Sequence, residues 1–209
     1  MTKVLLTPGA HGFFDELVTL LVSLSSFNAA VESFWNRGLT TIPNTPGHPL
    51  RLYGRFVVVE WKPNEFMHDV TRDRWPTTLS IDLLDPTAPE ARVNDSGVPF
   101  ASSAVAAMVH GLVGSMFITY FERVREQVEA KFGASVSAWP SVWNFGRTVR
   151  NALTHRGVLE IRSANAPPVT WRSVSLTHTD NGQELLAPTK FLGVGDLIPL
   201  LLEMDASVA

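Results

Sequence analysis

Apolar and polar residues follow a helical period near the start of the chain. From about Gly12 to Arg37, apolar side chains recur at helical spacing, and Gly38 follows as a helix terminator. Because this spacing gathers the apolar side chains on one face, it predicts a long amphipathic helix. The apolar positions of that helix are Phe13, Leu17, Leu20, Leu21, Leu24, Phe27, Ala30, Val31 and Phe34.

The pattern changes between Leu39 and Pro99. Prolines are frequent there, and they separate short runs rich in β-branched and aromatic residues, such as Arg55–Trp61 and Thr77–Asp82. Proline interrupts helices and central strands, whereas β-branched runs favour strands. We therefore expect an irregular insert over about 39–99, with one or two strands, packed over the helices.

The longest proline-free stretch follows this insert. Residues 101–132 present a wide apolar face, and Gly133 is expected to end the helix that they form. Glycine lowers helix stability, so Gly111 and Gly114 are expected to mark close contact with another helix. The apolar face is broad enough for both a core and a dimer interface.

Two more helices are predicted in the last third of the chain. One begins with Ser141 as its N-cap and runs to about His155, before Gly157. The other fits Asp196–Met204, where Pro199 is tolerated because it falls in the first turn.

A short β segment is predicted between these two helices. Residues 169–177 alternate as a strand, a turn signal follows, and residues 184–186 are expected to pair back onto that strand. The predicted fold is therefore mainly α, with four helices and a few added strands. It forms a single domain over residues 1–209, with the partly β insert at about 39–99 and a C-terminal hairpin at about 169–186.

Composition limits the classes of partner. The chain has 209 residues, 45% of them hydrophobic, and a formal net charge of -3. Proteins that coat nucleic acid through bulk electrostatics usually carry a strongly basic surface, so this class is disfavoured. Positive charge is nevertheless concentrated in one region, where an anionic ligand should be sought. The arginines of that region are Arg147, Arg150, Arg156, Arg162 and Arg172.

Cysteine is absent, which excludes disulfides, thiolate nucleophiles and sulfur-ligated metal sites. The first residues lack the charged and hydrophobic regions of a secretory signal, and no segment offers eighteen uninterrupted apolar residues. From these features we expect a cytoplasmic protein that does not engage a membrane.

The segment from Arg147 to His155 carries the candidate chemistry. On a helix, Arg147, Arg150, Asn151, Thr154 and His155 share one broad polar face, opposite an apolar face. Arginine offers a fork of donors to phosphate oxygens, and histidine can exchange a proton near neutral pH. The pattern indicates phosphodiester chemistry without a metal or other cofactor. The apolar face consists of Val149, Ala152 and Leu153.

The run from Arg150 to His155, RNALTH, resembles the hallmark of the HEPN superfamily (higher eukaryotes and prokaryotes nucleotide-binding). That hallmark is an arginine, four to six residues, and a histidine, and the residue after the arginine is commonly asparagine, as Asn151 is here. The resemblance implies a four-helix bundle that forms a homodimer, with two copies of the motif facing one cleft. In active members this cleft cleaves RNA without a metal, and many members act in toxin–antitoxin, phage-defence or RNA-processing systems.

The resemblance also implies roles for individual residues. His155 would act as general base or acid at the ribose 2′-hydroxyl or the leaving oxygen, and Arg150 would stabilise charge on the phosphoryl oxygens. Asn151 would orient one of these groups or bind the substrate. Arg147 and Thr154 on the same face are assigned to substrate binding, an assignment that rests on their position and not on the family motif.

Three other interpretations of this face remain open. It can belong to an enzyme that acts on a small anionic metabolite through the same arginines. It can be a solvated helix surface on which Arg150 pairs with Glu122 or Glu126 and His155 caps backbone carbonyls. It can also belong to a non-catalytic dimeric module that binds a nucleotide, RNA or a partner such as a cognate regulatory protein.

Short motifs also occur by chance, and two other groupings illustrate this. Arg172 and His178 match the same spacing on a predicted strand, where the pattern has no helical meaning. His68, Asp69 and Asp73 lie close together in a polar segment and are interpreted as a solvated turn. No metal site is predicted.

Overall fold

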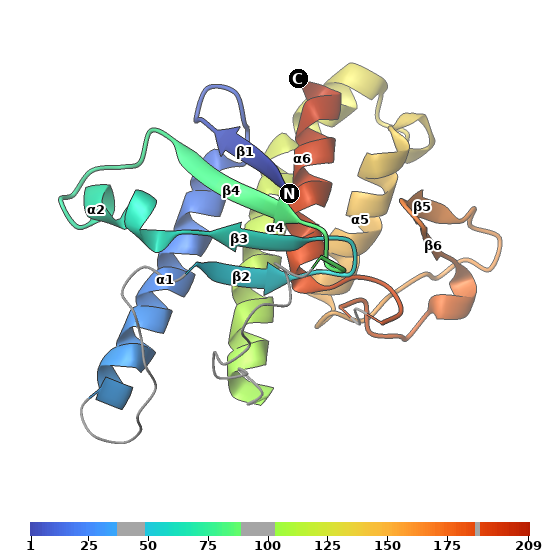
Figure 1. The fold of residues 1–209 in the computed structure, drawn as a ribbon. Helices are drawn as coiled ribbons and strands as arrows, with labels where there is room; N and C mark the ends of the chain where they lie inside the picture. The colour runs from blue at the N-terminus through green and yellow to red at the C-terminus, as the bar shows by residue number, and fades with distance from the viewer. Residues whose placement is uncertain (37–48, 89–102, 187–188) are drawn as a thin grey trace.

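The computed structural model describes residues 1–36, 49–88, 103–186 and 189–209, and this part of the chain forms a mixed α/β fold (Figure 1). It contains five helices, a four-stranded antiparallel sheet and a separate hairpin. The helices are α1 (Phe14–Asn36), α2 (Met67–Val70), α4 (Ser103–Phe132), α5 (Ser141–Thr154) and α6 (Leu197–Val208). The four long helices were predicted close to these bounds, and the predicted α6 was too short at its end.

The sheet is larger than the sequence pattern predicted. Its strands are β1 (Thr2–Leu6), β2 (Leu50–Tyr53), β3 (Val58–Trp61) and β4 (Leu79–Leu84), in the order β1-β4-β3-β2. The expectation of a mainly α chain is therefore corrected to a mixed one. The error came chiefly from β1, whose short apolar run lies far from the insert in sequence but pairs with β4.

The hairpin also differs from its prediction. The segment predicted as one strand is broken by a turn at Arg172, which has a positive φ of 51°, into β5 (Val169–Trp171) and β6 (Val174–Leu176). The predicted partner segment does not pair with it. Glu184 instead forms an isolated bridge with Val158, which ties the end of this region to the chain leaving α5.

The core lies between the sheet and the long helices. One face of the sheet contributes buried side chains to the same apolar cluster as the helices, and Figure 1 shows the sheet in front of α1, α4 and α6. The expectation that the insert packs over the helices is confirmed for its described residues. Sheet residues in this cluster include Leu6, Leu52, Val59, Trp61, Leu79 and Ile81.

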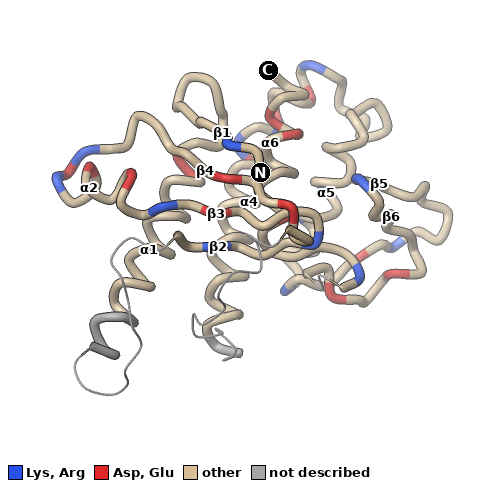
Figure 2. The backbone as a smooth tube through the Cα atoms, in the orientation of Figure 1, with Lys and Arg blue, Asp and Glu red and all other residues tan. Residues whose placement is uncertain are grey.

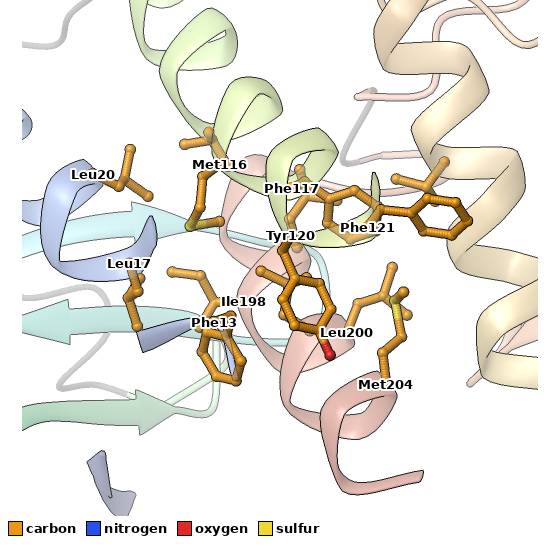
Figure 3. Close-up of a cluster of buried hydrophobic side chains, with 14 of the residues drawn as sticks. Phe13, Leu17, Leu20, Met116, Phe117, Tyr120, Phe121, Ile198, Leu200 and Met204 are labelled. Atoms are coloured by element: carbon orange, nitrogen blue, oxygen red, sulfur yellow. The ribbon is translucent and has the colours of Figure 1, made fainter. Parts of the chain in front are cut away.

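Helix α4 is central to this core, as Figure 3 shows for its contacts with α1 and α6. Val113, Phe117 and Tyr120 on its buried face have no solvent exposure. Gly114 faces Leu153 of α5 at ordinary contact distance, whereas a Cβ on Gly111 would meet nothing within 4 Å. The predicted close helix contact is therefore wrong for Gly111, and the tightest glycine of the helices is Gly146, where a Cβ would meet the Met204 sulfur at 2.6 Å.

The first half of α4 carries no acidic residue, lysine or arginine between Val105 and Phe121, and Figure 2 shows this part of the helix in tan. Among the described residues, the segment Val105–Phe132 is long and apolar enough to cross a membrane by length and composition alone. A buried core helix passes the same test, and 33% of the most apolar window is buried in the fold.

A buried carboxylate joins the sheet to the start of α6. Asp196 has no solvent exposure, and its oxygens accept hydrogen bonds from the backbone N–H groups of Arg55 (2.6 Å), Phe56 (2.9 Å) and Gly193 (2.8 Å). The β2–β3 turn is thereby held against the entry to α6. There is no room for a side chain between the two segments, since a Cβ on Gly193 would lie 2.7 Å from the Tyr53 carbonyl oxygen.

We expect Asp196→Asn to destabilise the protein strongly. The amide replaces one acceptor oxygen by an NH₂ group, so at least one buried backbone N–H loses its acceptor, at a cost of about 1–3 kcal/mol. Urea unfolding should show a lower midpoint with an unchanged slope. Asp73→Asn removes the same charge at an exposed site, and equal midpoints for the two variants would contradict the anchoring role.

A partly buried polar contact connects α4 with α6. The Tyr120 hydroxyl donates to Asp205 at 3.0 Å, and the same carboxylate accepts the backbone N–H of Gly12 at 3.1 Å. Burial, followed by the charge of Asp205, raises the pKa of Tyr120 well above its usual range. The neutral phenol is therefore strongly favoured in the folded protein.

This shift predicts a fall in stability at high pH. A tyrosine whose pKa is higher in the folded state loses its proton first in the unfolded chain, so its stabilisation is complete below about pH 10 and declines above it. The free energy of unfolding should fall by up to about 1.4 kcal/mol per pH unit relative to Tyr120→Phe. Chemical unfolding of both proteins between pH 8 and about pH 11 measures this. Parallel curves would contradict it.

Candidate functional site

Helix α5 presents the candidate residues on the side that faces away from the core. Val149 and Ala152 are fully buried and Leu153 packs against the core, as the helical pattern predicted. The opposite face points away from the core. Arg147, Arg150 and Asn151 on that face are only partly covered, and Thr154 and His155 are exposed. The candidate residues thus lie at the open C-terminal end of α5.

The Arg150 guanidinium is held by two neighbours. Its Nη2 forms an ion pair with Glu122 of α4, and its Nη1 donates to the Asn151 side-chain oxygen at 3.2 Å. Its Nε is buried and has no hydrogen-bond partner. The pairing with Glu122 is the one that the alternative interpretation of a solvated face named. The Arg150 side chain remains 31% exposed, so part of the guanidinium faces solvent.

His155 is held by a different carboxylate. Its ring Nε2 lies 2.9 Å from an oxygen of Glu160, whose other oxygen accepts hydrogen bonds from Arg162. The chain returns to His155 because Arg156 and Gly157 both adopt positive φ and reverse its direction after α5. The histidine side chain is 53% exposed, and no described residue forms a hydrogen bond with its Nδ1.

The helix end itself is closed by backbone contacts. The backbone N–H of His155 donates to the carbonyls of Asn151 and Ala152, and the Gly157 N–H donates to Ala152. His155 is thus the C-cap residue of α5 through its backbone N–H, while its ring contacts Glu160. At the other end, Pro140 precedes the helix and no side chain caps it, so the prediction of Ser141 as N-cap is wrong.

The remaining candidates have different surroundings. Thr154 donates its hydroxyl proton to the Asn151 carbonyl at 2.8 Å, which leaves its oxygen as an acceptor. Arg147 has a buried Nε without a hydrogen-bond partner. Within the described residues, no hydrogen bond or ion pair joins Arg150 to His155. The structure therefore places the candidates on one helix end but holds the guanidinium and the imidazole through separate carboxylates.

A groove of about 470 Å³ borders this helix end. It runs between α4 and the chain that leaves α5, and it adds polar side chains that the sequence pattern had not grouped with the motif. His110 was interpreted as a partly buried histidine, and it lies on the α4 wall. Residues that line the groove include His110, Leu153, Arg156, Gly157, Glu184 and Leu186.

Sequence reasoning did not find Glu160, and it named Arg162 only as one of the clustered arginines. Both belong to the segment after Gly157, which had no predicted secondary structure and therefore no predicted direction. Only the reversal at Arg156 and Gly157 brings Glu160 to the His155 ring. By contrast, Glu122 was named as a partner of Arg150, because the helical pattern placed it on a neighbouring helix.

In the described ranges, no group of three or more His, Asp or Glu side chains gathers in a way that could hold a metal ion. Met67–Val70 forms the short helix α2, which contains His68 and Asp69, and Asp73 follows with a positive φ of 58°.

Comparison of the chain with protein-family models, with curated proteins and with solved structures found no match in any of the three.

A double-mutant cycle on Arg150 and Glu122 should give a coupling energy of about 0.2–1 kcal/mol. Both side chains are about one-third exposed, so solvent screens the ion pair and offsets most of its attraction. Urea unfolding of Arg150→Ala, Glu122→Ala and the double variant measures the coupling. A value above about 3 kcal/mol, as for buried pairs, would identify Arg150 as a structural residue.

Proposed function

We propose that the protein is a HEPN-like, metal-independent endoribonuclease that acts through Arg150, Asn151 and His155. The observation that carries this proposal is the placement of a guanidinium and an imidazole at one open helix end, each oriented by a carboxylate. Four long helices that pack together, with α4 in contact with α1, α5 and α6, support the HEPN-like bundle. The sheet and the hairpin are additions to it.

The chemistry requires proton transfer and charge stabilisation. His155, oriented through Nε2 by Glu160, would use Nδ1 to take the proton of a ribose 2′-hydroxyl. The 2′-oxygen then bonds to phosphorus, the bond to the 5′-oxygen breaks, and the His155 imidazolium gives its proton to that oxygen. The products are a 2′,3′-cyclic phosphate and a 5′-hydroxyl end. Arg150 would stabilise the negative charge that develops on the phosphoryl oxygens.

Substrate binding would change the contacts of Arg150. A guanidinium has five N–H donors, of which the described contacts use one for Glu122 and one for Asn151. A phosphate could therefore bind the remaining donors or displace Glu122. Arg147, Thr154 and the groove beside α5 would position the neighbouring nucleotides.

We further propose a homodimer in which two copies of the motif face one cleft. The first half of α4 offers a contact surface, because it lacks formally charged side chains and exposes the small residues Ala107 and Gly111. Small residues allow two helices to approach closely. A cytoplasmic location without membrane contact fits a protein that meets RNA.

A second candidate function is a non-catalytic dimeric module that binds RNA, a nucleotide-like anion or a cognate regulatory protein. One observation favours it: both Arg150 and His155 pair with carboxylates of this chain. Neither residue then needs to react, and the partly exposed face can serve recognition alone.

Mixed RNA incubated with the purified protein in EDTA should be cleaved. We expect Arg150→Ala and His155→Ala each to slow cleavage by about 100-fold or more, since each removes charge stabilisation or proton transfer. Arg172→Ala is a matched control, because Arg172 also pairs with an exposed glutamate, Glu203, at 3.0 Å and belongs to the accidental match of the same spacing. Its cleavage rate should not change.

Circular dichroism and solution mass complete the experiment. All variants should keep the wild-type spectrum, and the wild type should have the mass of a dimer. Absence of cleavage by the wild type, with anisotropy showing that it binds labelled RNA, would favour the binding module. A strictly monomeric wild type that cleaves RNA would contradict the shared cleft.

A further inference from the structure

A second groove of the described structure borders another side of α4 and meets the groove beside α5 at Ser115 and Thr119. It measures about 620 Å³, within the usual range for small-molecule sites, and runs between α1 and α4 with Trp75 on its rim. Its floor is apolar: Leu20 and Met116 have exposures of 3% and 5%, and Figure 3 shows them on facing parts of α1 and α4.

The Trp75 indole on the rim of the groove is fixed by a hydrogen bond and is still accessible to solvent. Trp75 Nε1 donates a hydrogen bond to Asp15 at 3.0 Å, which fixes the ring relative to the first turn of α1. The tryptophan is nevertheless 53% exposed. An accessible tryptophan face attracts cations through its quadrupole, and its area also packs against aliphatic chains.

The polar groups on the α1 wall are hydrogen-bond acceptors. Thr19 donates its hydroxyl proton to the Asp15 carbonyl at 2.8 Å, and Ser23 donates its own to the Thr19 carbonyl at 2.7 Å. Both hydroxyl oxygens therefore keep only lone pairs for a ligand. One carboxylate oxygen of Asp15 accepts from Trp75, and no described residue donates to the other. Such a wall fits a ligand that donates hydrogen bonds.

The net charge of the groove is modest. Glu16 also lines it, but Arg123 pairs with Glu16 at 2.7 Å and neutralises it. Asp15 then supplies the uncompensated negative charge, against the partial positive charge, roughly half an elementary charge, of the α1 N-terminus. Among the described lining residues there is no lysine, arginine or histidine. One uncompensated carboxylate suits a ligand with a single positive charge and not a polycation.

We propose that this groove binds a primary alkylammonium ligand. The ammonium group donates hydrogen bonds to Asp15 and Thr19 beside the Trp75 ring, and the alkyl chain covers the apolar floor of Leu20, Leu112 and Met116. Neither the RNA chemistry nor the residues of the α5 end enter this site.

Three probes of similar size test the recognition of charge. n-Hexylammonium, n-hexanol and hexanoate are titrated at pH 7 into the protein, and binding is followed by tryptophan fluorescence and by amide NMR shifts. We expect n-hexylammonium to bind about tenfold more tightly than n-hexanol, with shifts at Asp15 and Thr19, and hexanoate to bind least. Equal binding of all three, or no shift in these residues at millimolar probe, would overturn the proposal.

Three variants test whether ligand binding depends on this groove or on the protein surface in general. Asp15→Asn keeps an acceptor for Trp75 but removes the charge, so the preference for n-hexylammonium over n-hexanol should disappear. Trp75→Leu should weaken n-hexylammonium binding by about fivefold or more. Asp73→Asn is the matched control: it removes a carboxylate from the same exposed loop outside the groove and should leave binding unchanged. RNA cleavage by all three variants should equal that of the wild type, so this test and the nuclease test fail independently.

Discussion

The fold depends on the buried Asp196 carboxylate and its three backbone donors. These hydrogen bonds join the β2–β3 turn to the loop that begins α6, two segments separated by about two-thirds of the chain. The carboxylate is fully buried, and within the described ranges its hydrogen-bond donors are backbone N–H groups, which compensate its charge. Because glycines at 54, 193 and 195 let the two backbones approach, the sheet can lie directly on the helices.

That constraint determines where the two open sites of the molecule lie. The sheet covers one side of the long helices, so α4 can expose surface only along its remaining sides. One of these borders the end of α5, where Arg150 and His155 are held by Glu122 and Glu160. Another borders α1, where the Trp75 indole donates a hydrogen bond to Asp15 beside an apolar floor. Both sites therefore consist of polar groups that adjacent segments position around one apolar helix.

Local pattern was sufficient for the long helices but not for the sheet. The bounds of α1, α4 and α5 follow from apolar spacing and from glycines with positive φ at 133 and 157. Strand β1 escaped prediction because five residues carry too little alternation to identify a strand whose partner, β4, lies more than seventy residues away. At the candidate site, Arg150, Asn151 and His155 could be grouped from their helical spacing. Glu160 could not, because its approach to His155 depends on the reversal after α5.

The order of residues alone determined which side chains of each long helix turn inward, since helical geometry and the burial of apolar surface act locally. It also determined that Arg150, Asn151 and Thr154 share one side of α5. Only the tertiary structure decided that the N-terminal segment joins the sheet, that Asp196 joins distant backbones, and which carboxylate holds each charged group. Those outcomes depend on contacts between segments remote in sequence, whose free energy exists only once the whole chain has packed.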